Sequence, residues 1–184
     1  MEDSKMIQLL WDRESDVFPL LDKQFGKRLF GIARNILGNP SDAEETVNDT
    51  YFAVWNTIPP QRPNPLAAFV YKIGRNLALK RHRDNTAVKR NGTYDLSLDE
   101  LAGCIPGPCL EEDFEARELG RLIDAFLDTQ SRDNRNLFLR RYWYGDSVKD
   151  LAKAFGISQN TASVRLSRMR GQLKDYLNKE GYYA

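Results

Sequence analysis

Histidine and cysteine are scarce in this chain of 184 residues, which contains one histidine and two cysteines. His82 lies far in sequence from Cys104 and Cys109, and three side chains cannot complete the four ligands of a structural zinc site. We therefore expect no metal ion and no other cofactor. The two cysteines lie in a stretch rich in glycine and proline, where reduced thiols and a redox-active disulfide remain two alternatives.

Long apolar runs are missing as well, since nowhere do 18 consecutive apolar residues occur. The acidic N-terminus shows no signal-peptide pattern, so we expect no membrane segment and a cytoplasmic protein. The sequence also contains no phosphate-cradling glycine loop and no nucleophile or paired-carboxylate motif. These absences predict a protein that is not an enzyme and has no small-molecule substrate.

The net charge is only +1 and identifies no partner, but the charges are unevenly distributed along the chain. Residues 91–118 hold eight acidic residues and one basic residue, whereas residues 72–90 hold seven basic residues and one acidic residue. Residues 158–174 hold four basic residues and no acidic one. The acidic and basic segments therefore need separate explanations.

Helical periodicity dominates the sequence from residue 5 to about residue 83 and returns from residue 119 to residue 177. No segment shows the strict alternation that is typical of strands. The sequence therefore predicts an all-α protein with two small helical domains, at residues 1–90 and 118–184. Residues 91–117 are expected to form an acidic flexible linker, because glycine and proline interrupt the pattern there.

A helix, a glycine turn and a second helix are predicted within the second domain. Ser147 and Asp150 have the spacing of a capping box, which indicates a helix start. Gly156 is suited to a tight helix end, and Ser158 is placed to cap the next helix. A helix-turn-helix is the favoured interpretation, and a helical hairpin with an ordinary solvated face is the alternative.

The second helix of this motif separates apolar from polar positions. Its predicted buried face consists of Ala162, Leu166, Met169 and Leu173. Short polar or basic side chains dominate the rest of the surface, and such side chains suit base edges and phosphates in a major groove. These candidate DNA contacts are Gln159, Asn160, Ser163, Val164, Arg165, Ser167 and Arg168. Arg140 and Arg141 are candidates for additional backbone contacts, whereas the aromatic residues that follow them are expected in the core.

An acidic helix is predicted in the first domain over residues 41–55, with Ser41 as its cap. Its apolar stripe contains Ala43, Val47, Val54 and either Thr50 or Tyr51. Another face combines acidic side chains with an aromatic one, which resembles a protein-docking surface more than a nucleic-acid interface. The residues of this face are Asp42, Glu45, Asn48, Asp49 and Phe52. The alternative is a solvated face with Phe52 in the core.

A basic helix is predicted over residues 66–83, behind a loop at residues 57–65 that contains four prolines. The expected apolar side of the helix consists of Leu66, Phe69, Val70, Ile73 and Leu77. The other side is basic, and phosphate contact is its simplest use. A stiff loop beside a basic helix is able to hold an unstacked base, but a plain helix connector fits the same residues.

Several strings in both predicted domains resemble the extracytoplasmic-function (ECF) class of sigma factors, in the sigma-70 family of RNA polymerase subunits. The resemblance covers most of the chain apart from the linker. The strings are Phe25–Phe30, Ile36–Glu45 and Tyr71–Leu79 in the first domain, and Phe138–Tyr142, Leu151–Ser158 and Arg165–Arg168 in the second.

The resemblance implies a transcription initiation factor. It implies that the acidic helix binds the clamp helices of the largest subunit of core RNA polymerase, and that the second domain meets the polymerase flap. It implies that the helix-turn-helix reads the minus-35 promoter element as double-stranded DNA. The loop and the basic helix would open the minus-10 element and read the melted strand. The expected minus-10 contacts are Arg62, Asn64, Tyr71, Lys72, Arg75, Asn76, Lys80 and Arg83.

The chain also departs from the family pattern. Asn48, Phe69 and Val164 replace residues that are commonly Gln, Trp and a polar residue, so the promoter sequence is not predicted. An anti-sigma factor is a possible further partner. The competing function is that of a DNA-binding regulator that does not engage polymerase.

Overall fold

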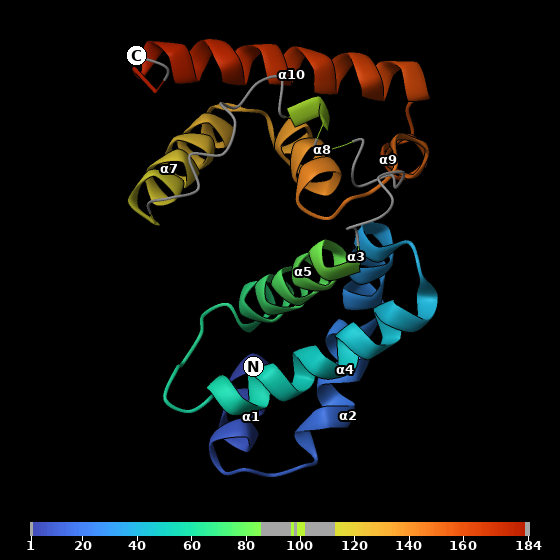
Figure 1. Ribbon diagram of the computed structural model, residues 1–184, viewed down its shortest axis with the longest axis vertical. Helices are drawn as coiled ribbons and strands as arrows, with labels where there is room; N and C mark the ends of the chain where they lie inside the picture. Colours follow the sequence, from blue (N-terminus) through green and yellow to red (C-terminus); the bar gives the residue numbers. More distant parts are fainter. Residues whose placement is uncertain (1, 86–96, 98, 102–112, 183–184) are drawn as a thin grey trace. The chain divides into compact units, whose positions relative to one another are not determined.

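A computed structural model describes residues 2–85, 97, 99–101 and 113–182. The chain divides into two compact units, Met1–Gly92 and Thr93–Ala184, which are described separately (Figure 1). The described residues are helical or irregular and contain no strand, which confirms the predicted all-α class. Cys104 and Cys109 lie outside the described residues. No helix in the described ranges is long and apolar enough to cross a membrane.

The first unit is a helical bundle in which three longer helices pack against one another. A short N-terminal part precedes them and covers one end of their core. The elements are α1 (Glu2–Trp11), α2 (Val17–Leu21), the π-helical turn η1 (Asp22–Gly26), α3 (Lys27–Leu37), α4 (Pro40–Thr57) and α5 (Leu66–Asn85).

Helix α4 begins one residue earlier than Ser41, so the predicted cap was wrong. Asn39 is the N-cap, and its side chain accepts a hydrogen bond from the backbone N–H of Ser41 at 3.0 Å. Pro40 occupies the first helical position, where its fixed φ and missing N–H have no cost. The predicted apolar stripe of this helix is confirmed, and both Thr50 and Tyr51 are buried in it.

The buried line of α5 differs from the prediction. It runs through Leu66, Val70, Gly74 and Ala78, whereas the predicted Phe69, Ile73 and Leu77 are only half-buried beside it. The small residues explain the difference. A Cβ atom on Gly74 would lie 2.3 Å from Cδ2 of Leu29 in α3, so α5 approaches its neighbour more closely than larger side chains would allow.

The second unit contains α7 (Asp113–Thr129), α8 (Arg132–Tyr142), α9 (Val148–Phe155) and α10 (Gln159–Lys179). The predicted caps of its helix-turn-helix are confirmed. The Ser147 hydroxyl accepts from the N–H of Asp150 at 3.1 Å, and the Ser158 hydroxyl accepts from the N–H of Thr161 at 3.0 Å. Gly156 has a φ of 63°, the left-handed conformation that a tight helix end requires.

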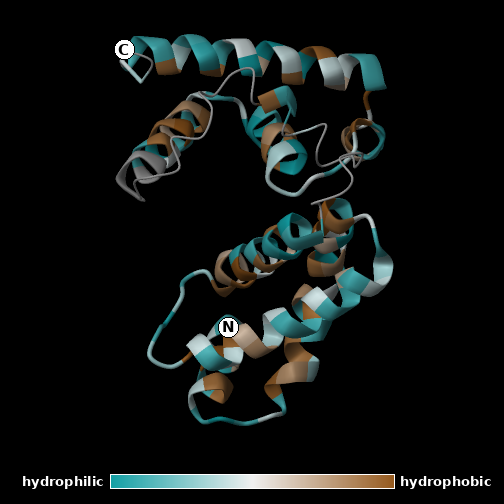
Figure 2. Ribbon diagram, in the orientation of Figure 1, coloured by the Kyte–Doolittle hydropathy of each residue, from teal (hydrophilic) through white to brown (hydrophobic). Residues whose placement is uncertain are grey.

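The core of the second unit is closed by the apolar face of α10. The predicted Ala162, Leu166, Met169 and Leu173 are all buried, and Leu177 continues the line. Figure 2 shows hydrophobic segments recurring between hydrophilic ones along this helix. Because one face of α10 is buried in this way, its opposite face is turned to solvent for its first four turns.

Candidate nucleic-acid and protein interfaces

The predicted DNA-reading face of α10 is accessible. Gln159, Asn160, Ser163, Val164, Ser167 and Arg168 are exposed, and Arg165 is half-buried. Val164 is 40% exposed although it is apolar, so its methyl groups are free to contact another molecule. The residues that precede α10 fix this orientation, because α9 packs against α10 and the capped turn at Gly156 joins them. The structure thus brings all seven predicted residues to one helix surface.

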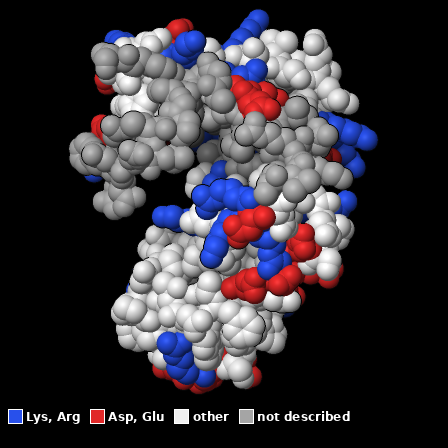
Figure 3. Space-filling view, in the orientation of Figure 1, with Lys and Arg blue, Asp and Glu red and all other residues white. Residues whose placement is uncertain are grey.

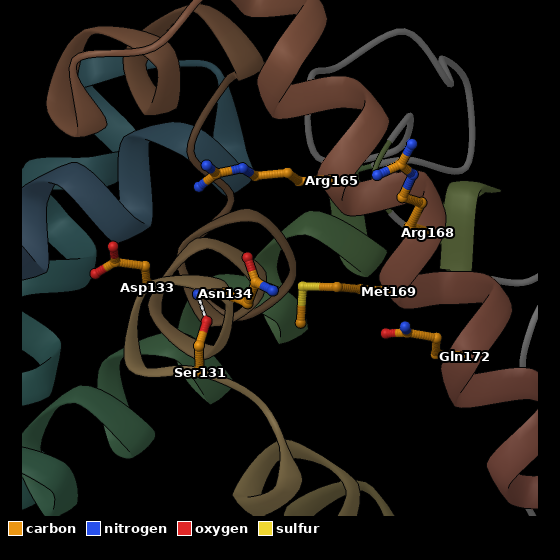
Figure 4. A pocket seen from close by; sticks show the side chains of 7 residues that line it. All are labelled: Ser131, Asp133, Asn134, Arg165, Arg168, Met169 and Gln172. Atoms are coloured by element: carbon orange, nitrogen blue, oxygen red, sulfur yellow. Dashed lines mark hydrogen bonds between the residues drawn. The ribbon is translucent and has the colours of Figure 1, made fainter.

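A hollow of about 430 Å³ lies between the start of α8 and the face of α10. Arg165 extends from α10 across the start of α8, whereas Arg168 stays beside α10 (Figure 4). Ser131, the N-cap of α8, accepts a hydrogen bond from the N–H of Asn134 at 3.3 Å. Ser131 and Asn134 were not predicted to lie at this surface. The Ser131 cap was visible in the sequence, but only the packing of α8 on α10 places it there.

Two arginines of the second unit, one of them a candidate for a DNA-backbone contact, have internal partners. Arg141 is only 3% exposed, and Arg170 is half-buried on the side of α10 that faces α8. Both donate hydrogen bonds to the carboxylate of Glu100. Arg141 is therefore not accessible for the DNA-backbone contact for which it was a candidate, and Arg170, one of the four basic residues of 158–174, is paired inside the unit.

Three side chains of the described residues hold the Glu100 carboxylate. Its Oε1 lies 2.7 Å from a terminal nitrogen of Arg141, and its Oε2 lies 3.1 Å from a terminal nitrogen of Arg170. The Tyr142 hydroxyl lies 3.0 Å from Oε2 and 2.7 Å from Arg170. Burial raises the pKa of Tyr142 well above its ordinary value, although the hydrogen bond from Arg170 opposes the shift. Tyr142 is therefore neutral at physiological pH and is able to donate to Glu100.

A second hollow, of about 470 Å³, lies in the first unit between the proline-rich loop and the first turns of α5. Its lining brings together the predicted Arg62, Asn64 and Lys72, all of which are exposed. The guanidinium of Arg62 stacks on the ring of Trp11, with 4.2 Å between Cζ and the ring centroid. The role of Trp11 as a support for this loop was not predicted, because the two residues are 51 positions apart in the sequence.

The other predicted minus-10 residues lie along α5 and not in this hollow. Asn76, Lys80 and Arg83 are exposed and follow Lys72 at helical spacing, so these four residues form a row on one side of the helix. Arg75 is half-buried. Tyr71 is half-buried too and packs edge-on against Phe25, with ring centroids 5.8 Å apart. Tyr71 is therefore tied to the core of the unit more than to the basic row.

The acidic face of α4 is less acidic than its sequence indicates, because α5 supplies a cation to it. Arg81 forms ion pairs with Glu45 at 2.9 Å and with Asp49 at 3.2 Å. It also donates to the backbone carbonyl of Asp42 at 3.2 Å. The hydrogen bond from Arg81 to Glu45 raises the pKa of Arg81, so the guanidinium stays charged. Figure 3 shows basic and acidic side chains side by side on a face of the first unit.

Phe52 projects from α4 and is 62% exposed, which confirms the outward orientation. It does not stand alone. Phe18 of α2 lies 5.9 Å from the Phe52 ring and 5.2 Å from the Trp55 ring, measured between centroids. The three rings form an aromatic cluster beside Glu45, Asn48 and Asp49 of the acidic face. Phe18 was not predicted at this surface, since it belongs to a different helix.

Comparisons with known proteins find a matching domain and several relatives. Residues 21–88 match the model of Sigma-70 region 2. The chain is 25% identical over 159 residues to the ECF RNA polymerase sigma factor SigE of Mycolicibacterium smegmatis, a match that covers 86% of this chain and 61% of SigE. It is 29% identical over 176 residues to the RNA polymerase sigma factor CnrH of Cupriavidus metallidurans, a match that covers 89% of this chain and 87% of CnrH.

Among solved structures, the chain is similar to CnrH in a structure of CnrH in complex with the cytosolic domain of CnrY. The sequence identity is 20%, the TM-score is 0.46, and the match covers 97% of this chain and 99% of CnrH. The matched region-2 segment contains α4 and α5, the helices that carry the acidic face and the basic row of the first unit. The relatives reported above extend the likeness over most of the chain. The Sigma-70 region 2 match and these relatives together support an ECF sigma factor of the sigma-70 family.

Proposed function

We propose that the protein joins core RNA polymerase to promoter DNA and directs transcription initiation in the bacterial cytoplasm, without catalysing a reaction itself. The observation that carries this proposal is the pair of unlike surfaces on the first unit. One helix, α5, exposes a row of basic side chains, while its neighbour α4 exposes acidic side chains beside an aromatic cluster. A DNA-binding regulator that does not engage polymerase would have no use for the second surface.

The α4 face is the proposed docking surface for the clamp helices of the largest polymerase subunit. Exposed aromatic side chains are typical energetic centres of protein interfaces, and charged side chains around them favour specific orientation. Phe52, with Phe18 and Trp55 behind it, supplies the aromatic centre. Because Arg81 pairs with two of the acids, it also holds them in one arrangement before docking.

The two DNA-reading surfaces are assigned to different promoter elements. The accessible face of α10, with its arginines and short polar side chains, is suited to the major groove of the minus-35 element. The hollow beside the proline-rich loop is suited to a base of the melted minus-10 strand, with the basic row of α5 on the phosphates. The polymerase flap is the proposed contact of the second unit. An anti-sigma factor is a further proposed partner, because CnrH, to which this chain is similar, occurs in a complex with CnrY.

Run-off transcription with purified core polymerase tests the proposal as a whole. The complete chain should retain core polymerase in a pull-down and support transcripts from a subset of genomic fragments. Retention of DNA without retention of polymerase would favour the competing regulator.

Neutralising the acidic face tests the docking surface. The combined substitution of Glu45→Gln and Asp49→Asn should weaken core binding, whereas reversal to lysine would place new cations against Arg81 and disturb the fold itself. Asp124→Asn with Asp175→Asn makes the same change in net charge at exposed positions of the second unit and serves as the control. Equal core affinity of both double variants would contradict the assignment of this face.

A further inference from the structure

Glu100 lies inside the segment that the sequence predicts to be a linker, yet it is bound to the second unit. Its partners come from three places in that unit: Arg141 near the end of α8, Tyr142 beside it, and Arg170 in the middle of α10. The neighbouring side chains join the contact, because Ser97 is 1% exposed and Leu101 packs on the hydrophobic core. The segment around Glu100 is thus held against the second unit, or docked, by the apolar contact of Leu101 and by the ion pairs of Glu100.

The receiving site is built for a carboxylate. The guanidinium of Arg141 is 3% exposed and meets Glu100 through two of its nitrogens, at 2.7 and 3.4 Å. Its remaining terminal nitrogen donates to the backbone carbonyl of Asp146 at 3.1 Å. A buried arginine that loses its anion leaves an uncompensated charge, which is strongly unfavourable. The buried Arg141 therefore favours a bound carboxylate, and Glu100 supplies it.

Docking changes how far the chain can extend between the two units. Asn85 ends α5, and Glu100 follows 15 residues later, a span of at most about 50 Å in extended chain. Without the docked residue, the next anchored point is Asp113 at the start of α7, 28 residues from Asn85 and at most about 100 Å away. Docking therefore roughly halves the length of chain between Asn85 and the next residue that is anchored in the second unit, and a shorter tether limits how far apart the two units can lie.

We propose that the Arg141, Tyr142 and Arg170 site binds the Glu100 carboxylate as an internal ligand, and that this docking sets the range of promoter spacings that the protein accepts. Glu100 is a positioning residue and touches no DNA. The part of the proposal that concerns spacing rests on the proposed function in transcription initiation, whereas the docking itself does not.

Glu100→Gln in the complete chain tests the docking, because it keeps the shape of the side chain and removes its charge. Asp99→Asn is the matched control, since Asp99 is the exposed neighbour and the change in net charge is the same. Amide hydrogen exchange of peptides that contain Leu101 should be at least tenfold faster in Glu100→Gln than in the control. Arg170→Gln should give a smaller increase, because Arg141 retains the carboxylate. Exchange that is equally slow in both acid variants would overturn the docking.

Run-off transcription from promoters with spacers lengthened one base pair at a time tests the consequence. Relative to the standard spacer, Glu100→Gln should use the longer spacers several-fold better than wild type or Asp99→Asn. A merely structural loss would reduce transcription from all spacers by the same factor, and that result would overturn the spacing claim. If even the wild type gives no transcripts with core polymerase, the proposed function fails, while the exchange measurement still decides the docking.

Discussion

Replacing Gly74 in α5 by alanine is expected to destabilise the first unit, although alanine is the better helix former. The added Cβ would lie 2.3 Å from Cδ2 of Leu29 and 3.1 Å from Oγ1 of Thr50. Leu29 is 1% exposed and Thr50 is fully buried, so neither side chain has free space to enter. Overpacking costs about 1–3 kcal/mol, and the gain in helix propensity returns about 1 kcal/mol. The free energy of unfolding should fall by about 0–2 kcal/mol.

Gly31 of α3 provides the matched control in the same unit, because nothing lies within 4 Å of a Cβ atom at that position. Gly31→Ala should therefore raise the free energy of unfolding by about 1 kcal/mol, through helix propensity alone. The two alanine variants should differ by about 1–3 kcal/mol with opposite signs relative to wild type.

Urea unfolding of the complete chain provides the measurement. A Trp143→Phe background restricts tryptophan fluorescence to Trp11 and Trp55, both in the first unit. The urea midpoint should be highest for Gly31→Ala, intermediate for wild type and lowest for Gly74→Ala. The slope of the free energy of unfolding against urea concentration should be the same for all three proteins. A Gly74→Ala protein as stable as Gly31→Ala would refute the argument that close approach of α5 to α3 requires glycine there.

Three further predictions concern the surfaces and the core. Arg165→Ala and Arg168→Ala should each weaken promoter binding by about 1–3 kcal/mol if the arginine contacts a base, or reduce the slope of log affinity against log salt concentration by about 1 if it contacts a phosphate. Fluorescence anisotropy titrations at several salt concentrations measure both quantities, and a variant that changes neither is not at the interface. Phe52→Ala should weaken core polymerase binding by at least about 1 kcal/mol without lowering the free energy of unfolding, because the Phe52 ring is mostly exposed. An unchanged affinity for core polymerase in a binding titration would exclude Phe52 from the docking surface. Burial and the hydrogen bond to Asp22 raise the pKa of Tyr51 above its ordinary value of 10.0, so the contribution of Tyr51 to stability is complete below about pH 10 and is lost as the pH rises further. Tyr51→Phe should remove this loss from a plot of the free energy of unfolding against pH, and an unaltered plot would show that another group causes it.

Much of the local structure was predictable because it depends on neighbours in sequence. The caps at Ser147 and Ser158, the left-handed Gly156 and the buried face of α10 all follow from spacings of three and four residues. The same reasoning found the apolar stripe of α4 and the accessible face of α10. It missed the cap of α4 by two residues, since Asn39, Pro40 and Ser41 are all favoured at helix starts.

The charged surfaces were only partly predictable, because a charge pattern within one helix says nothing about the helix beside it. Arg81 is counted in the basic stripe of α5, but in the fold it reaches the acids of α4 and reduces their net charge. Arg170 is counted on a DNA-binding helix, but its side chain points to the inner partner Glu100. In both cases the partners are more than 30 residues apart in sequence.

The sequence by itself determined the helical class, the helix-turn-helix and the family resemblance, because these depend on periodicity, capping and motifs that short segments contain. Tertiary structure alone decided which charged residues are available to other molecules. It placed Phe18 beside Phe52, set Trp11 beneath Arg62 and bound Glu100 to Arg141. The physical reason is that neighbours in space decide whether a charge is buried or paired, and these neighbours belong to helices that are distant in sequence.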